Sequence, residues 1–154
     1  MYTVTPIAIV HSPRKDPSDD GWGDVRATIE LEPGQDPAAL EGLEAFSHAE
    51  ILFLFDRVSE TAVVRGARHP RDNPAWPVVG IFAQRAKDRP NRLGSTIVRI
   101  AGRSGRTLEV VGLDAVDGTP VLDIKPVMRE FLPRTEVRQP EWASELMRDY
   151  WTGR

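Results

Sequence analysis

The chain has 154 residues, 40% hydrophobic and 28% charged, which is the size and composition of one globular domain. It contains no cysteine, which excludes disulfides, thiolate zinc sites and a cysteine nucleophile. The net charge of −3 argues against a general nucleic-acid binder, and no apolar run approaches the ~20 residues that a membrane-spanning helix needs. The basic residues near the N-terminus follow the apolar ones, the wrong order for a signal peptide, so we expect one cytoplasmic domain over residues 1–154.

Strand patterns dominate the sequence. Residues 4–10 form a short apolar run, and residues 25–31 alternate apolar with polar side chains, as a half-buried strand does. The most apolar stretch, 46–55, is typical of a central strand buried on both faces. Further strands are expected at 78–83, 96–100, 108–113 and 120–124. Short strands at nearly regular spacing predict a mainly β protein, a small closed or partly closed β-barrel.

Two helices are expected beside these strands. Asp36 followed by Pro37 is a typical start for a short helix that continues over residues 38–43. The segment PEWASELMRDYW, residues 140–151, predicts a C-terminal helix with an apolar stripe. The stripe consists of Trp142, Leu146 and Tyr150. We expect it to pack on the barrel or on a second subunit.

Positive charge is concentrated in the middle of the chain. Residues 65–106 contain ten basic and two acidic side chains, a formal charge of +8, so the remaining residues carry −11. This distribution can present one basic face to a polyanion. The arginines can equally pair with acidic residues elsewhere in the chain, and charge alone does not choose between the two.

Polar residues gather in a second stretch, GLDAVDGTPVLDIKP, at 112–126. On a strand, Asp123 and Lys125 point to the same face. The stretch is either a hairpin with a surface ion pair or, as we slightly favour, a polar lip that binds a cationic or hydroxyl-bearing ligand. The three histidines lack the spacing of metal ligands, so no metal site is expected.

Four segments together resemble the TsaA-like family, also called TrmO. They are PIAIVHSP (6–13), EGLEAFSHAEILFLF (41–55), GIFAQRAKDRPNRLGST (80–96) and GLDAVDGTPVLDIKP (112–126). The resemblance implies an S-adenosylmethionine-dependent methyltransferase built on a small β-barrel. The implied acceptor is N6 of threonylcarbamoyl-adenosine, next to the anticodon of a tRNA. A homodimer with the cofactor near the subunit interface is also implied.

The resemblance further implies which residues form the site. Those that would contact the cofactor are Asp56, Arg57, Arg85, Asn91, Ser95, Gly112, Leu113 and Asp114. Those that would contact the tRNA are Arg68, Arg71, Arg85, Arg89 and Asn91. We therefore expect the arginine loop, residues 85–94, and the aspartate segment, residues 112–118, to meet at one rim of the barrel.

Three further roles stay open. Gly21 and Trp22 are a candidate wall of the cofactor site, although the indole can equally cover the core. Asp117 and Asp123 are candidate general bases, and solvent can take the proton instead. Asp114 is interpreted as a hydrogen-bond acceptor for the cofactor. The alternative functions are methylation of a small molecule and non-catalytic binding of S-adenosylmethionine or RNA; an exposed basic patch would favour RNA, and buried ion pairs a small acceptor.

Overall fold

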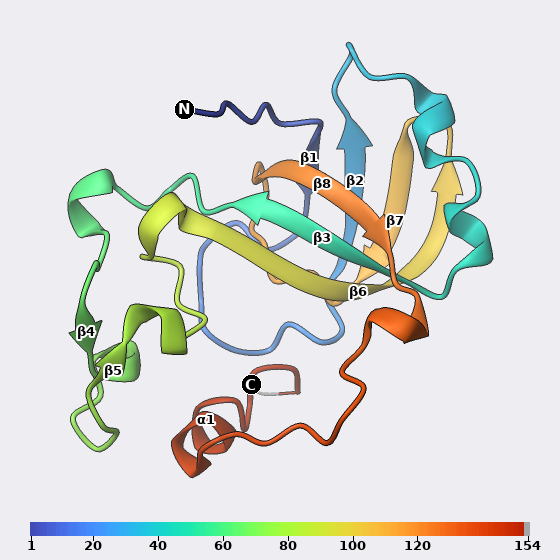
Figure 1. Ribbon diagram of the computed structural model, residues 1–154. Helices are drawn as coiled ribbons and strands as arrows, with labels where there is room; N and C mark the ends of the chain where they lie inside the picture. Colours follow the sequence, from blue (N-terminus) through green and yellow to red (C-terminus); the bar gives the residue numbers. More distant parts are fainter. Residues whose placement is uncertain (153–154) are drawn as a thin grey trace.

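Six antiparallel strands close into a barrel in the computed structural model, which describes residues 1–152 (Figure 1). The neighbours around the barrel follow the order β1-β2-β7-β6-β3-β8. The strands are β1 (Ala8–His11), β2 (Arg26–Leu31), β3 (His48–Leu54), β6 (Leu93–Ser104), β7 (Thr107–Val111) and β8 (Pro120–Pro126). The architecture confirms the predicted mainly β barrel.

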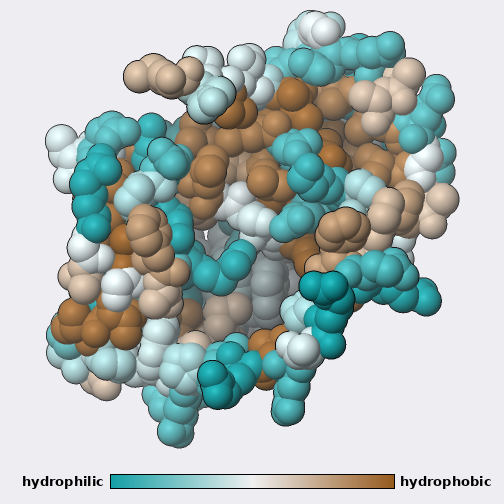
Figure 2. Space-filling view, viewed as in Figure 1, coloured by the Kyte–Doolittle hydropathy of each residue, from teal (hydrophilic) through white to brown (hydrophobic). Residues whose placement is uncertain are grey.

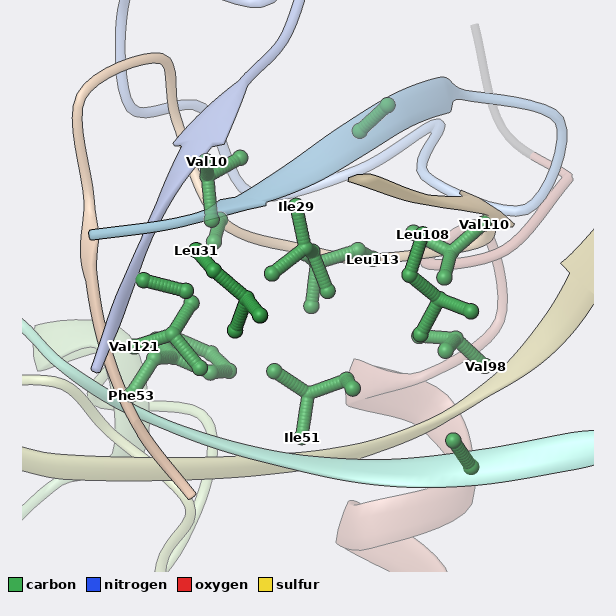
Figure 3. Packing of buried hydrophobic residues seen from close by; sticks show 14 of the residues in the cluster. Val10, Ile29, Leu31, Ile51, Phe53, Val98, Leu108, Val110, Leu113 and Val121 are labelled. Atoms are coloured by element: carbon green, nitrogen blue, oxygen red, sulfur yellow. The ribbon is translucent and has the colours of Figure 1, made fainter. Parts of the chain in front are cut away.

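Alternate side chains of the strands fill the barrel (Figure 3). Ile29 from β2, Ile51 and Phe53 from β3, and Leu108 from β7 are almost completely buried. The expectation that residues 46–55 form a strand buried on both faces is wrong, because every second side chain of β3 is only partly buried. A closed barrel has one interior, so only one face of each strand points inward and is buried.

A long excursion leaves the barrel between β3 and β6. It contains a separate two-stranded sheet of β4 (Ala67–Arg68) and β5 (Val79–Gly80), which lies to one side of the barrel in Figure 1. The strand predicted over residues 78–83 is therefore shorter than expected. After Gly80 the chain turns into a 3-10 helix, Ile81–Ala83, which buries Ile81.

The helices are shorter than their sequence patterns predict. The Asp36 carboxylate accepts a hydrogen bond from the Ala38 amide at 2.9 Å, which confirms the cap, but the 3-10 helix spans only Pro37–Leu40. Near the C-terminus α1 covers Glu141–Leu146. No helix within residues 1–152 is both long and apolar enough to span a bilayer.

Candidate functional site

The Asp114 carboxylate lies just beyond β7 and is held on both of its oxygens. The Thr96 hydroxyl, from β6, donates to Oδ1 at 2.5 Å, and the Tyr150 hydroxyl, from the segment after α1, donates to Oδ2. Two distant parts of the chain therefore converge on this carboxylate. Because each carboxylate oxygen can accept about two hydrogen bonds, both retain the capacity to bind a ligand.

The backbone before Asp114 explains its orientation. Gly112 adopts a positive φ of 92° that few other residues tolerate, and its amide donates to the Val25 carbonyl at 2.9 Å. Leu113 is then completely buried in the barrel core. The buried leucine anchors the chain and leaves Asp114 partly exposed, so the structure does not present Leu113 to a ligand.

Two arginines lie near enough to the Tyr150 hydroxyl to affect its pKa. Burial and the neighbouring Asp114 carboxylate raise the pKa of the Tyr150 hydroxyl well above its usual range, while Arg71 and Arg85 act in the opposite direction. The Arg85 guanidinium also donates to the Ser95 carbonyl at 2.6 Å. The site thus combines a fixed carboxylate, a protonated phenol and two guanidinium groups.

The end of the arginine loop lies close to the start of the aspartate segment. Ser95, whose carbonyl binds Arg85, directly precedes Thr96, whose hydroxyl binds Asp114. These contacts connect Arg85 of the arginine loop to Asp114 of the aspartate segment through two successive residues of β6.

Two turns beside the site have unusual backbone conformations. Arg71 and Asp72 have φ values of 52° and 56°, and Asn91 and Arg92 have values of 66° and 51°. Each pair follows a proline. Residues other than glycine adopt this left-handed region at a cost of about 1–3 kcal/mol each, and they cluster at functional sites. The two turns are therefore candidates for ligand-contacting segments.

The arginines expected to bind tRNA are largely engaged within the chain. Arg68 forms a bidentate pair with Asp88, and Arg71 lies 3.3 Å from Asp20. Arg89 donates to a backbone carbonyl at 2.5 Å. Arg68 and Arg71 are thus placed in ion pairs within the chain, and Arg89 in a hydrogen bond to a backbone carbonyl.

A second polar cluster surrounds Asp117. Its carboxylate accepts hydrogen bonds from the Lys15 ammonium at 2.8 Å and from the Ser12 amide at 2.9 Å, and these donors lower the pKa of Asp117, the lysine more strongly. Arg57 donates to the Lys15 carbonyl at 2.6 Å, while the neighbouring Asp56 is exposed. None of these contacts joins the cluster to Asp114.

The remaining candidate base lies on β8. The Asp123 carboxylate is 3.1 Å from the Lys125 ammonium, which confirms that the two side chains share a face. Within residues 1–152, no group of three His, Cys, Asp or Glu side chains is arranged to hold a metal ion.

Gly21 and Trp22 are held by contacts with other residues of the chain. Trp22 is 3% exposed, and the Arg14 guanidinium carbon lies 3.9 Å from the centroid of its ring. The Gly21 amide donates to the Tyr150 carbonyl at 2.9 Å. Trp22 is a candidate for a wall of the cofactor site or for a cover of the core, and its burial favours the cover of the core.

Sequence reasoning missed Thr96 and the role of Tyr150. Thr96 was an ordinary strand residue, and Tyr150 was identified only as a member of an apolar stripe. Their common partner is 18 and 36 residues away in the chain, respectively. No local pattern signals such a contact, although a tyrosine on an otherwise apolar stripe is a hint, because a buried hydroxyl needs a partner.

The fold is that of a small protein built on one closed antiparallel β-barrel, and the comparisons with known proteins identify its family. The family model described as the tRNA-methyltransferase O N-terminal domain, TrmO_N, matches residues 10–131. The chain belongs to this family.

The chain is similar to several named proteins and to a solved structure, and it covers a different share of each. A Pyrococcus abyssi protein named "Probable S-adenosyl-L-methionine-binding protein" is 36% identical over 144 residues, 90% of this chain and 74% of that one. Human tRNA (adenine(37)-N6)-methyltransferase is 37% identical over 102 residues, 66% of this chain and 23% of the enzyme. A crystal structure of TrmO from Pseudomonas aeruginosa has a TM-score of 0.72 at 34% identity, covering 90% of this chain and 61% of that one. The chain therefore spans less than two thirds of the human enzyme and of the TrmO crystal chain.

Proposed function

We propose that this protein is an S-adenosylmethionine-dependent methyltransferase that acts on N6 of threonylcarbamoyl-adenosine next to a tRNA anticodon. Family membership and the names of the similar proteins support this function. The observation that carries it is the Asp114 carboxylate, fixed by Thr96 and Tyr150 beside Arg85.

The residues present fit the methyl donor. S-adenosylmethionine carries ribose hydroxyls, an ammonium group and a sulfonium, all of which suit a carboxylate with unused acceptor capacity such as Asp114. Its own carboxylate suits the planar donors of an arginine, and Arg85 is exposed next to the site. Asn91 is exposed in the strained turn and offers both donors and acceptors. The bound donor supplies the electrophilic methyl group; the chain supplies its alignment.

Alignment is the main contribution expected of the protein. Fixing the reacting atoms in near-attack geometry can supply up to ~7–11 kcal/mol of the acceleration. Asp117 and Asp123 remain the proposed proton acceptors, but each is paired with a lysine that would have to move first. Asp114 already has a donor on each oxygen and is better suited to orienting a ligand.

We assign the tRNA contacts to the exposed part of the arginine loop. Arg85, Lys87 and Asn91 are exposed, whereas Arg68 and Arg71 act first as ion-pair partners that shape the excursion. An unpaired anticodon-loop base can be splayed out and held at such a rim. A tRNA acceptor also supports the cytoplasmic location.

A small-molecule acceptor is the second candidate. The pairing of Arg68 with Asp88 and of Arg71 with Asp20 favours it, because paired arginines are less available to phosphates. Both candidates use the same methyl-donor site.

The homodimer implied by the resemblance is proposed as well. Figure 2 shows apolar side chains at the surface among hydrophilic ones. The stretch after β8 is exposed throughout residues 128–141, and Phe131 in it is 86% exposed. A second copy would cover such side chains, and sedimentation velocity measures whether it does.

Calorimetry with S-adenosylmethionine tests the methyl-donor site. The wild-type protein is expected to bind, Asp114→Ala to lose most of its affinity, and Asp16→Ala, a change at an exposed aspartate, to bind like the wild type. A wild-type protein that does not bind would remove the methyltransferase from consideration.

Mass spectrometry of tRNA nucleosides tests the acceptor. A strain that lacks the protein is expected to lose N6-methylated threonylcarbamoyl-adenosine and to regain it with the wild-type gene. If the tRNA nucleosides of that strain are unchanged while the wild-type protein binds S-adenosylmethionine, the small-molecule acceptor is favoured.

A further inference from the structure

The residues after α1 are fitted against the loop that precedes β2. The amides of Gly21 and Trp22 donate to the Tyr150 carbonyl, both at 2.9 Å, and the Gly23 amide donates to the Trp151 carbonyl at 2.8 Å. A Cβ atom at Gly23 would overlap the Trp151 carbonyl oxygen and stand 3.1 Å from its carbon. The loop therefore lacks a side chain where the segment passes. We call residues 141–152 the C-terminal strap.

The strap is also attached on its other side. The Trp76 indole N–H, in the excursion that holds β4 and β5, donates to the Glu145 carboxylate of α1 at 3.1 Å. In Figure 1 α1 lies below the barrel on the side of the small sheet, and the rest of the strap turns back from there. Attachment at both ends fixes the path of the backbone between them.

This path delivers the Tyr150 hydroxyl to Asp114. The Tyr150 ring is further fixed by an edge-on contact with the Trp151 ring, with 4.8 Å between the centroids. A phenol is protonated at neutral pH, so its hydroxyl donates to the carboxylate there, and the raised pKa of Tyr150 extends this to alkaline pH. A phenol in this place therefore orients the carboxylate without competing with it for protons.

We propose that Tyr150 is a positioning residue: its hydroxyl holds the Asp114 carboxylate in the orientation in which that carboxylate binds the methyl donor. This inference rests on the proposed function, because it takes Asp114 as a ligand of S-adenosylmethionine. It makes the strap, which lies beyond the residues 10–131 matched by the family model, a part of the binding site.

The opposite role for the same contact would be that the strap blocks the carboxylate. Two observations favour positioning. Thr96 and Tyr150 each bind a different oxygen of Asp114, which leaves acceptor capacity on both. The strap is held by backbone hydrogen bonds to three successive residues, as expected of a permanent part of the site and not of a segment that is displaced by each ligand.

Tyr150→Phe tests the inference, with Tyr2→Phe as the matched control. The control makes the same chemical change at the only other tyrosine, which is 98% exposed. Calorimetry of the folded proteins with S-adenosylmethionine is expected to show an affinity about tenfold weaker for Tyr150→Phe and unchanged for Tyr2→Phe, the effect of losing one hydrogen bond to a charged group. In kinetics, the KM for the donor is expected to rise while kcat at saturating donor changes little.

Thr96 provides the second pair of variants. Thr96→Val removes the other donor to Asp114 and is expected to weaken binding, while Thr96→Ser keeps a hydroxyl and is expected to restore it. If these side chains had a purely structural role, the variants would lose stability, but affinity would not fall in Thr96→Val and recover in Thr96→Ser.

The possible outcomes separate the two proposals. If the wild-type protein binds S-adenosylmethionine and Tyr150→Phe binds equally well, the positioning role is wrong and the proposed function stands. Tighter binding by Tyr150→Phe would identify the strap as a blocking element and also overturn the positioning role. If the wild-type protein does not bind, the proposed function fails and this inference fails with it.

Discussion

Arg68 and Asp88 form a bidentate ion pair in which both nitrogen–oxygen distances are 2.7 Å and both side chains are 20% exposed. Arg68 belongs to β4, and Asp88 lies in the arginine loop, so the pair ties the two halves of the excursion together. A sheltered bidentate pair is geometrically well defined and stronger than an exposed one. The pair therefore helps to place the arginine loop beside Asp114.

We expect Arg68→Ala to lower the free energy of unfolding by about 2 kcal/mol, because a partly buried carboxylate is left without its partner. Arg65→Ala is the matched control. Arg65 is exposed and lies 3.6 Å from an equally exposed Glu60, so its removal is expected to change stability by less than about 0.5 kcal/mol. Urea unfolding measures both variants, and equal losses would contradict the stabilising role of the Arg68–Asp88 pair.

Tyr150 is expected to resist ionisation in the folded protein. Tyrosinate absorbance is measured through pH ~10, the ordinary tyrosine value, on the wild type and on Tyr150→Phe, and the two curves are expected to coincide. Tyr150 is expected to remain protonated there, because burial and the Asp114 carboxylate raise its pKa. Two tyrosinates forming near pH ~10 in the folded protein would contradict the Tyr150–Asp114 contact.

The same shift makes stability depend on pH in one direction. The folded state keeps the Tyr150 proton at a pH where the unfolded chain releases it, so this contribution is complete below pH ~10 and is lost as the pH rises above it. In Tyr150→Phe this part of the alkaline decline is expected to disappear.

The barrel could be predicted from local patterns, whereas the convergence on Asp114 could not. The alternation over residues 25–31 identified β2, because one buried and one solvated face leave a period of two in the sequence. The same reasoning was wrong for residues 46–55, where partly buried apolar residues on the outward face of β3 resembled a second buried face. Tyr150 looked like a packing residue, since its partner is reached only when the barrel has closed and the strap has returned to it.

Asp117 is expected to keep its charge as the pH falls through the ordinary aspartate range, near pH ~3.9. The hydrogen bond from the Lys15 side chain, followed by that from the Ser12 amide, lowers its pKa. A lowered pKa in the folded state contributes stability above the unfolded value, and this contribution is lost as the pH falls through the folded value. A carboxyl-carbon NMR titration is expected to show Asp117 titrating below the ordinary aspartate value, and Lys15→Met is expected to move its pKa upward. No movement would mean that the Lys15 contact is absent in solution.

Gly23→Ala tests whether the strap passes where the structure places it. The added Cβ would overlap the Trp151 carbonyl oxygen, and because backbone lies on both sides of the contact, the strap has to move. We expect a loss of stability of about 1–3 kcal/mol, as for other overpacked sites. The displaced strap would also release the Tyr150 hydroxyl from Asp114, so the tyrosinate titration is expected to move toward the ordinary range.

Gly34→Ala is the control for this change, since a Cβ there meets no atom within 4 Å. It makes the same substitution in open space and is expected to leave both stability and the Tyr150 titration unaltered. Thermal unfolding and tyrosinate absorbance, measured on both variants, separate the steric effect at Gly23 from the general effect of replacing a glycine. If the two variants behaved alike, the strap would not lie against the Gly21–Gly23 loop in solution, and the attachment that delivers Tyr150 to Asp114 would be lost with it.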